Sequence, residues 1–168
     1  TSATVAGLVP FAIGTETHGS IISPSHTCGA TGLRPTFGSI SRSGAMTLSW
    51  SLDKVGPICR SAEDAATVFA YIHGTDNKDA SAVTAAFNYN SKTDEKTLRI
   101  GYAKNHFDKL DSSAQEWSVL KVLKDQGLEI KPMYFPDTEV YAFDIIGQVI
   151  GAESAAAFDA FTRTGLDD

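Results

Sequence analysis

The sequence predicts an α/β fold, and the clearest support is a strand, helix, strand pattern in the C-terminal half. Residues 98–102 (LRIGY) have the composition of a strand. Ser113 followed by Glu116 is a capping-box pattern that opens a helix, and we expect this helix to end at Gly127. Residues 128–131 (LEIK) alternate as a second strand. A helical crossover of this kind returns a parallel neighbouring strand with a right-handed connection, which is typical of α/β sheets.

The N-terminal half is richer in glycine and proline and offers fewer regular elements. The apolar run at residues 8–13 (LVPFAI) has the character of a strand and leads into the stretch GTETHGSIISP, residues 14–24. Between Ser20 and Pro57, recurrent glycine and proline predict a backbone path of tight turns rather than long helices or strands. Such a path usually surrounds a site or the edge of a core.

One helix is predicted in this half and two in the other. The first is opened by Ser61, with Asp64 three residues on, and ends near Gly74. The last spans about residues 139–163 and is weakened at two glycines. These two glycines are Gly147 and Gly151. In the first helix the apolar positions expected to face the core are Val68, Phe69 and Ile72; in the helix after Ser113 they are Val119, Leu120, Val122 and Leu123.

The chain is expected to form one segment of a larger domain. Residues 85–96 (AAFNYNSKTDEK) are polar and predict a surface loop between a motif-rich part, residues 1–84, and the strand-helix-strand part with its final helix, residues 97–168. The sequence begins Thr-Ser-Ala-Thr, and no basic region precedes its apolar run, so it lacks the layout of a signal peptide. We therefore expect a piece of a longer, cytoplasmic protein.

Composition argues against several classes of function. The 168 residues are 42% hydrophobic and 20% charged, as in an ordinary soluble domain, and no apolar run approaches the roughly 20 residues that cross a bilayer. The net charge of −6 disfavours direct binding to the phosphates of a nucleic acid. The lysines and arginines are also scattered along the sequence rather than clustered into a basic patch. No metal site is predicted, since Cys28, Cys59, His26, His73 and His106 lack ligand spacing.

Ser20 is the residue whose role most needs an explanation. A phosphate-binding loop is excluded, because Ser20 stands where that motif needs Lys and Glu16 places a negative charge in the loop. The nucleophile elbow G-x-S-x-G fails as well, because Ile22 occupies its second glycine position. A serine in such a turn most often bonds the local backbone. However, a strand-to-turn junction of small residues can also aim consecutive N–H groups at one point and stabilise an oxyanion.

The residues around Ser20 resemble those of the amidase signature hydrolases, whose hallmark contains a D/E-T-G-G-S turn. The corresponding residues are Glu16-Thr17-His18-Gly19-Ser20. The resemblance continues through AGLVPFAIGTETHGSIISPSHTCGATGLRPTFGSISRSG and SLDKVGPICRSAEDAATVF, and more loosely through LRIGY and GAESAAAFDAFTR. It implies the fold of that family, a mixed central β-sheet flanked by helices.

The resemblance also implies a mechanism. Ser20 would be the acyl-forming nucleophile of a Ser-cisSer-Lys triad, with the backbone N–H groups of Thr17, His18, Gly19 and Ser20 forming the oxyanion hole. A neutral Lys that relays protons through a second Ser can activate a weak hydroxyl, and no metal or organic cofactor is required. In the family both partners precede the helix that residues 1–7 represent. We therefore expect an active parent protein and an inactive isolated piece that self-associates through its unpaired edges.

Two residues depart from the family pattern. His18 replaces the first glycine of the turn, and we expect its side chain to line the substrate pocket. Ile22 replaces an arginine that is common there, which removes a charge near the site. Other matching residues are expected to have structural roles: Cys28 packs, and Asp53, Arg60, Arg34 and Arg42 fix loops.

Three functions remain open at this point. The first is an amidase acting on a small carboxamide or amino-acid amide. The second is the glutamine-hydrolysing A subunit of a glutamyl-tRNA(Gln) or aspartyl-tRNA(Asn) amidotransferase, which works with a partner that holds the tRNA. The third is a non-catalytic scaffold or binding homologue, which the departures at His18 and Ile22 favour. The presence of a Gly-Ser-Ser run and an earlier Lys upstream of Thr1 would separate the catalytic functions from the third.

Overall fold

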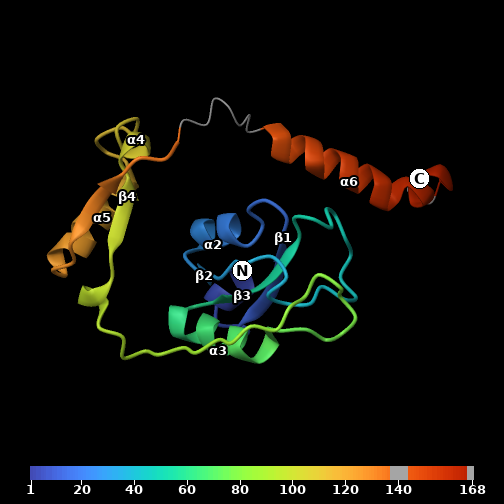
Figure 1. Ribbon diagram of the computed structural model, residues 1–168, viewed down its shortest axis with the longest axis horizontal. Coiled ribbons are helices and arrows are strands. Elements are labelled where there is room, and N and C mark those ends of the chain that lie inside the picture. The colour runs from blue at the N-terminus through green and yellow to red at the C-terminus, as the bar shows by residue number, and fades with distance from the viewer. Residues whose placement is uncertain (137–143, 166–168) are drawn as a thin grey trace. The chain divides into compact units, whose positions relative to one another are not determined.

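The structure is a computed structural model that describes residues 1–136 and 144–165. Its fold is α/β, as predicted, and the chain divides into two compact units (Figure 1). One unit comprises Thr1–Tyr89 with Phe143–Asp168, and the other comprises Asn90–Ala142. The boundary between Tyr89 and Asn90 falls within the polar stretch 85–96, and the C-terminal helix groups with the N-terminal unit.

The first unit is built around an antiparallel sheet with the strand order β1-β3-β2. These strands are β1 (Ala12–Glu16), β3 (Lys54–Cys59) and β2 (Thr31–Gly32). The register pairs Gly14 with Gly56 and Glu16 with Lys54, so the last residue of β1 lies opposite the first residue of β3. Strand β1 begins at Ala12 rather than at residue 8, which corrects the predicted position by four residues.

Three helices accompany this sheet, and one of them was not predicted. They are α1 (Ser2–Val5), α2 (Ile22–Cys28) and α3 (Ala62–Ile72). The prediction of tight turns rather than long elements after Ser20 did not include α2, which is only two turns long and contains Pro24 near its start, where a proline costs no intrahelical bond. The cap of α3 is confirmed, because the Ser61 hydroxyl accepts a hydrogen bond from the Asp64 backbone N–H at 3.1 Å.

The core of the first unit lies beneath the turn that joins β1 to α2. Ile21 is fully buried there, and it faces glycines in three strands: a Cβ added at Gly14, Gly32 or Gly56 would crowd its side chain. Close approach of backbone to Ile21 therefore requires glycine at these positions. The three residues expected to form the buried face of α3 are only half-buried, whereas Ala65 and Ala66 are buried.

The second unit contains the predicted strand-helix-strand arrangement. Strands β4 (Ile100–Ala103) and β5 (Ile130–Met133) are parallel, and α5 (Gln115–Asp125) connects them. Two short helices, η1 (Glu95–Thr97) and α4 (Lys104–Phe107), precede and follow β4. Both strands lie two residues or fewer from their predicted positions, which confirms the pattern.

The predicted capping box of α5 is wrong. The Ser113 hydroxyl donates a hydrogen bond to Asp111 Oδ1 at 2.6 Å. This bond orients the hydroxyl toward Asp111 rather than toward the N–H groups at the start of the helix. The helix starts one residue later than a cap at Ser113 would place it, with Ala114 as the N-cap residue and no side-chain cap. Its end at Gly127 is confirmed, since Gly127 has a φ of 80° and closes the helix. Of the four positions in its expected core stripe, Leu120 is buried and Leu123 half-buried, whereas Val119 and Val122 are exposed.

The C-terminal helix, α6 (Asp144–Arg163), runs without a break through Gly147 and Gly151. Residues 139–143 of the predicted helix lie outside the described residues. No helix in the described ranges, residues 1–136 and 144–165, has the length and apolarity to cross a membrane.

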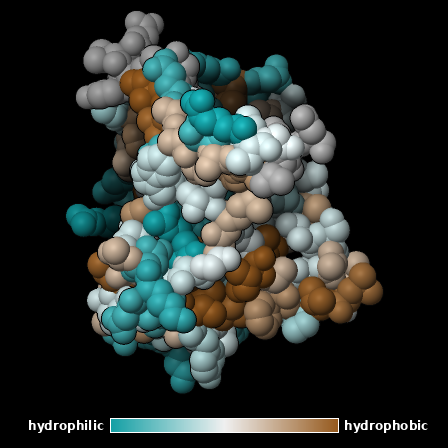
Figure 2. All heavy atoms as spheres, turned by 90° about the vertical axis from the view of Figure 1, so that its right-hand side faces the viewer, coloured by the Kyte–Doolittle hydropathy of each residue, from teal (hydrophilic) through white to brown (hydrophobic). Residues whose placement is uncertain are grey.

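Many large apolar side chains are exposed. On the face in Figure 2 hydrophobic side chains form several patches among hydrophilic ones. Leu8, Met46, Tyr71 and Tyr134 are each more than two-thirds exposed. Self-association of the isolated chain stays a prediction that this surface supports.

Candidate active site

The Ser20 turn, residues 17–21, connects the end of β1 to the start of α2. Gly19 has a φ of 116°, a backbone conformation that L side chains rarely adopt. This conformation turns the chain between Glu16 and Ile22, and it leaves Ser20 exposed at the surface of the turn. A Cβ added at Gly19 would meet no atom within 4 Å, so glycine is needed there for its backbone angles rather than for space.

The buried carboxylate of Glu16 fixes the far end of the turn. Its Oε2 accepts hydrogen bonds from the backbone N–H of Ile21 at 2.8 Å and of Ile22 at 2.9 Å. The Arg34 Nε lies 3.7 Å from the other oxygen, Oε1. Glu16 is only 5% exposed, so these donors and the arginine supply the partners that a buried charge requires. The carboxylate thus satisfies the two N–H groups at the start of α2.

The preceding N–H groups remain uncommitted. Among the residues that the structure describes, the backbone N–H groups of Gly19 and Ser20 donate no hydrogen bond. Two adjacent free donors beside a serine hydroxyl are the arrangement that an oxyanion hole requires. The Glu16 contacts and the φ of Gly19 together create this pair, because they hold the backbone on both sides of it.

Asp53 fixes the near end of the turn. Its Oδ1 accepts a hydrogen bond from the Thr17 hydroxyl at 2.6 Å. Its Oδ2 accepts from the backbone N–H groups of Leu48 at 2.8 Å and Ser49 at 3.0 Å. Asp53 therefore ties the Ser20 turn to the loop that precedes β3, in the loop-fixing role that the sequence predicts.

Lys54 follows Asp53 and lies beneath the same turn. Its residue exposure is 9%, and its Nζ donates to the Thr17 carbonyl oxygen at 3.3 Å. Burial lowers the pKa of the Lys54 ammonium below its ordinary value, and the nearby Arg34 charge lowers it further, against the opposing effect of Glu16 and Asp53. A buried cation consequently lies at the base of the Ser20 turn.

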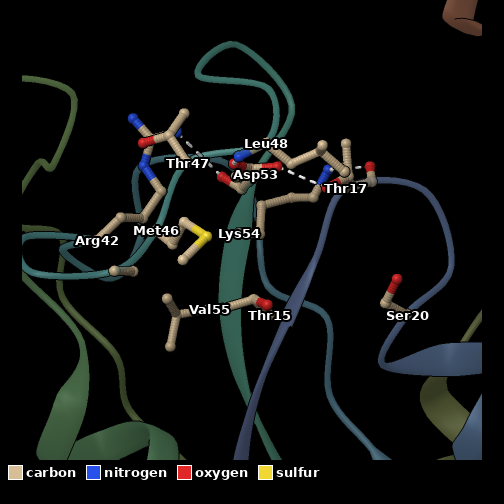
Figure 3. A pocket seen from close by; sticks show the side chains of 11 residues that line it. Thr15, Thr17, Ser20, Arg42, Met46, Thr47, Leu48, Asp53, Lys54 and Val55 are labelled. Carbon is tan, nitrogen blue, oxygen red and sulfur yellow. Dashed lines mark hydrogen bonds between the residues drawn. The ribbon is translucent and has the colours of Figure 1, made fainter. Parts of the chain in front are cut away.

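These residues line a cavity of about 150 Å³. In Figure 3 the Ser20 hydroxyl points upward, toward the Thr17 end of β1, and Lys54 extends to the same end. The cavity mixes hydroxyl, charged and apolar groups, which suits a small polar organic ligand. Its lining consists of Thr15, Thr17, Ser20, Arg42, Ala45, Met46, Thr47, Leu48, Asp53, Lys54 and Val55.

Arg42 holds the loop that forms the outer wall of the cavity. Its Nε donates to Asp79 Oδ2 at 3.1 Å, and its terminal nitrogens donate to the Trp50 carbonyl at 2.6 Å and the Ser81 hydroxyl at 2.7 Å. Hydrogen bonds from Ser81 and Arg42 hold the pKa of the Asp79 carboxyl well below its usual range. The guanidinium also lies 4.7 Å from the centre of the Phe37 ring. The N–H groups of Arg42 thus hold this loop in place, which is the structural role that the sequence predicts.

The same loop contacts α6. Glu153 Oε2 accepts hydrogen bonds from the Ser49 hydroxyl at 2.5 Å and from the Ser51 backbone N–H at 3.0 Å. Ser49 itself is fully buried. The Glu153 carboxylate, more than 100 residues away in sequence, therefore supports the loop whose Leu48 and Ser49 N–H groups donate to Asp53. Sequence reasoning missed this role.

The remaining predicted residues lie in different surroundings. His18 is exposed and is not among the residues that line the cavity, so its assignment to the substrate pocket stays a prediction. Arg60 lies at a separate groove of about 450 Å³ between α3 and the segment before β1, along with Tyr71 and Phe11. Cys28 and Cys59 are free thiols, and burial raises the pKa of Cys59. In the described ranges no three His, Cys, Asp or Glu side chains are grouped to hold a metal ion.

Sequence patterns predict neither the contacts of Glu16 with the start of α2 nor a role for Lys54. Glu16 matches the first position of the family turn and is unfavourable to phosphate binding, but neither observation shows that its carboxylate holds the turn. The pairing of β1 with β3 places Glu16 and Lys54 opposite each other, and this register depends on strands 40 residues apart. A lysine directly after the aspartate of SLDKVGP was the one local signal for Lys54.

The chain is similar to several known proteins. The model of the Amidase family matches residues 1–165. The A subunit of the glutamyl-tRNA(Gln) amidotransferase from Acinetobacter baumannii (strain AB0057) is 40% identical over 149 residues, which cover 83% of this chain and 30% of the relative. Among solved structures, the corresponding A subunit from Thermotoga maritima has a TM-score of 0.80 at 26% identity, covering 98% of this chain and 38% of the other.

A peptide amidase provides a further structural match. The native enzyme from Stenotrophomonas maltophilia has a TM-score of 0.63 at 26% identity, covering 94% of this chain and 35% of the other. The chain therefore spans about a third of the length of the proteins it matches.

Proposed function

Because the chain belongs to the amidase family, we propose that its full-length protein hydrolyses a carbon–nitrogen amide bond through an acyl-enzyme formed on Ser20. The observation that carries this proposal is the position of Ser20 beside the cavity, with the uncommitted N–H groups of Gly19 and Ser20 next to its hydroxyl. The chain is a third of its relatives in length, so the activity is proposed for the whole protein and not for this segment.

The proposed reaction has two stages. In the first, Ser20 Oγ attacks the amide carbonyl carbon, its proton passes to a base, and the carbonyl oxygen becomes an oxyanion that accepts hydrogen bonds from the turn. The C–N bond then breaks, and ammonia or an amine leaves with the proton. In the second stage, water hydrolyses the serine ester and restores the hydroxyl. No cofactor is needed at either stage.

The oxyanion site is proposed at the backbone of Thr17, His18, Gly19 and Ser20. Glu16 and Asp53 support it, because their carboxylates hold the two ends of the Ser20 turn. A rigid turn keeps its donors in place before the charge develops, which is how such donors lower a reaction barrier. The base is expected to be the Lys and second Ser that the family resemblance implies upstream of Thr1.

Ammonia release from a panel of amides tests the proposal. The panel includes glutamine, short aliphatic amides and aromatic amides, and the enzymes compared are the full-length protein and its Ser20→Ala and Ser23→Ala variants. Ser23 is an exposed serine three residues further on that does not line the cavity, so it is the matched control. We expect loss of activity in Ser20→Ala only. Equal activity in all three proteins would contradict the proposal.

A second candidate function is supported by the relatives named as the A subunit of glutamyl-tRNA(Gln) amidotransferase. In this case the protein would release ammonia from glutamine for a partner protein. Ammonia release that requires a co-purified partner, and that is restricted to glutamine, would favour this candidate. Release by the purified protein alone from several amides would favour an independent amidase.

A further inference from the structure

We propose that Lys54 recognises a carboxylate on the substrate and so directs Ser20 toward amides that bear an anionic group near the scissile bond. This inference rests on the function proposed above and names its substrate class. It is carried by the position of Lys54 in the cavity and by the absence, among the described residues, of a carboxylate partner for its ammonium.

Lys54 reaches the cavity from the strand opposite the Ser20 turn. The ladder between β1 and β3 places it across from Glu16, and both Lys54 and Ser20 line the cavity. The Nζ lies 3.3 Å from the carbonyl oxygen of Thr17, three residues before Ser20. A substrate whose amide reaches Ser20 would therefore extend toward Lys54 with the rest of its chain.

The other charged groups around the cavity are already committed. Both oxygens of Asp53 accept hydrogen bonds, from Thr17 and from the Leu48 and Ser49 backbone. Arg42 donates to Asp79, Ser81 and two backbone carbonyls. The two oxygens of Glu16 face α2 and Arg34. None of these groups is available to bind a substrate charge without losing its structural partner.

Lys54 is the exception. Its ammonium has three N–H donors, and one donates to Thr17. Within residues 1–136 and 144–165, no carboxylate lies within ion-pair distance of Lys54. A buried charge is costly unless it is paired. Glu16 and Asp53 act on the ammonium without forming an ion pair with it. A substrate carboxylate would pair with the ammonium directly and accept hydrogen bonds from its remaining N–H groups.

Four charged groups act on Lys54: Arg34 and Arg42 add positive charge near it, and Glu16 and Asp53 add negative charge. The Glu16 and Asp53 oxygens already accept hydrogen bonds from other donors, so a carboxylate that entered the cavity, which the Thr15 and Thr47 hydroxyls also line, would be the group that pairs with the ammonium directly. Burial, Arg34 and Arg42 lower the pKa of Lys54, and Glu16 and Asp53 raise it in part; a bound carboxylate would raise it further, so binding and protonation are coupled.

The test compares a charged amide with a neutral amide of the same length. Succinamate carries a carboxylate where succinamide carries a second carboxamide. Both are assayed with the full-length protein and with its Lys54→Met, Lys54→Arg and Lys109→Met variants; Lys109 is an exposed lysine of the other unit. For Lys54→Met we expect kcat/KM for succinamate to fall about 10- to 100-fold, with succinamide changed less than about threefold. Lys54→Arg should retain most of the preference, and Lys109→Met all of it.

A binding measurement separates failure of this inference from failure of the proposed function. Absence of hydrolysis of both amides and of glutamine, by the full-length protein with or without a co-purified partner, would overturn the function of Ser20. Calorimetric titration of succinamate and succinamide into Ser20→Ala, with and without Lys54→Met, would still decide the role of Lys54. Tighter binding of succinamate that depends on Lys54 supports the inference. The inference is overturned if Lys54→Met weakens the binding of both amides equally or leaves the binding of succinamate unchanged. If Lys54→Met does not fold, the titration is repeated with Lys54→Gln.

Discussion

A single carboxylate oxygen of Glu16 accepts a hydrogen bond from the backbone N–H of Ile21 at 2.8 Å, across the turn that carries Ser20. The same oxygen accepts from Ile22, so one buried side chain closes the loop between β1 and α2. Removal of this carboxylate would leave two buried or half-buried donors without partners.

Glu16→Ala should therefore destabilise the protein and disable the site. We expect the free energy of unfolding to fall by about 2–4 kcal/mol, since two hydrogen bonds to a charged group are lost. Activity toward any amide substrate should fall at least about 100-fold, because the N–H groups of Gly19 and Ser20 would lose their fixed positions. Glu116→Ala, at an exposed glutamate of α5, should change stability by less than about 1 kcal/mol. Unchanged kcat in Glu16→Ala would contradict the role assigned to this carboxylate.

The hydrogen bond between Thr17 and Asp53 should be measurable as a coupling. Thr17→Val removes the hydroxyl that donates to Asp53 Oδ1 at 2.6 Å, and Asp53→Asn weakens the acceptor. In a double-mutant cycle of unfolding free energies we expect an interaction of about 1–2 kcal/mol. Thr162→Val, at an exposed position of α6, is the matched control and should be nearly neutral. Strictly additive effects of the two site substitutions would refute the coupling.

Gly19→Ala isolates the conformational demand of the turn. No atom lies where the new Cβ would be placed, so the cost comes from the φ of 116° alone. We expect a loss of about 1–3 kcal/mol in the unfolding free energy, or a shifted turn with a lower kcat and a nearly constant KM. Gly151→Ala, in the interior of α6 and also without neighbours, should instead stabilise by about 0.5–1 kcal/mol. Equal effects of the two substitutions would show that backbone strain is not the cause.

The Asp79 carboxylate should make the cavity wall sensitive to acid. Hydrogen bonds from Ser81 and Arg42 lower its pKa below the ordinary value of 3.8. The stabilisation is therefore complete above about pH 4 and is lost as the pH falls from there toward the lowered pKa. Near pH 7, Asp79→Asn should reduce the unfolding free energy by about 1–3 kcal/mol, and this difference should shrink below about pH 4. A difference that stayed constant from neutral pH down to about pH 2 would contradict the linkage.

Local patterns predicted much of the architecture. Ser61 and Gly74 predicted the two ends of α3, and Gly127 predicted the end of α5, because helix caps and left-handed glycines depend on residues close in sequence. The strand, helix, strand order around α5 predicted that β4 and β5 are parallel. The capping box at Ser113 failed because Asp111, two residues away, competes for the same hydroxyl. Helix α2 was not predicted, because a seven-residue segment that contains a proline is too short to show the apolar spacing of a helix.

For the site, the sequence by itself determined the family and predicted the role of one residue. The order Glu16-Thr17-His18-Gly19-Ser20 and the motifs that follow it placed Ser20 in an amidase turn. It could not determine which side chains hold that turn or share its cavity. Lys54, Asp53 and Glu153 come to the site from 30 to more than 100 residues away, through strand register and the packing of α6. Such contacts depend on the energy of the whole fold, and only the tertiary structure decides them.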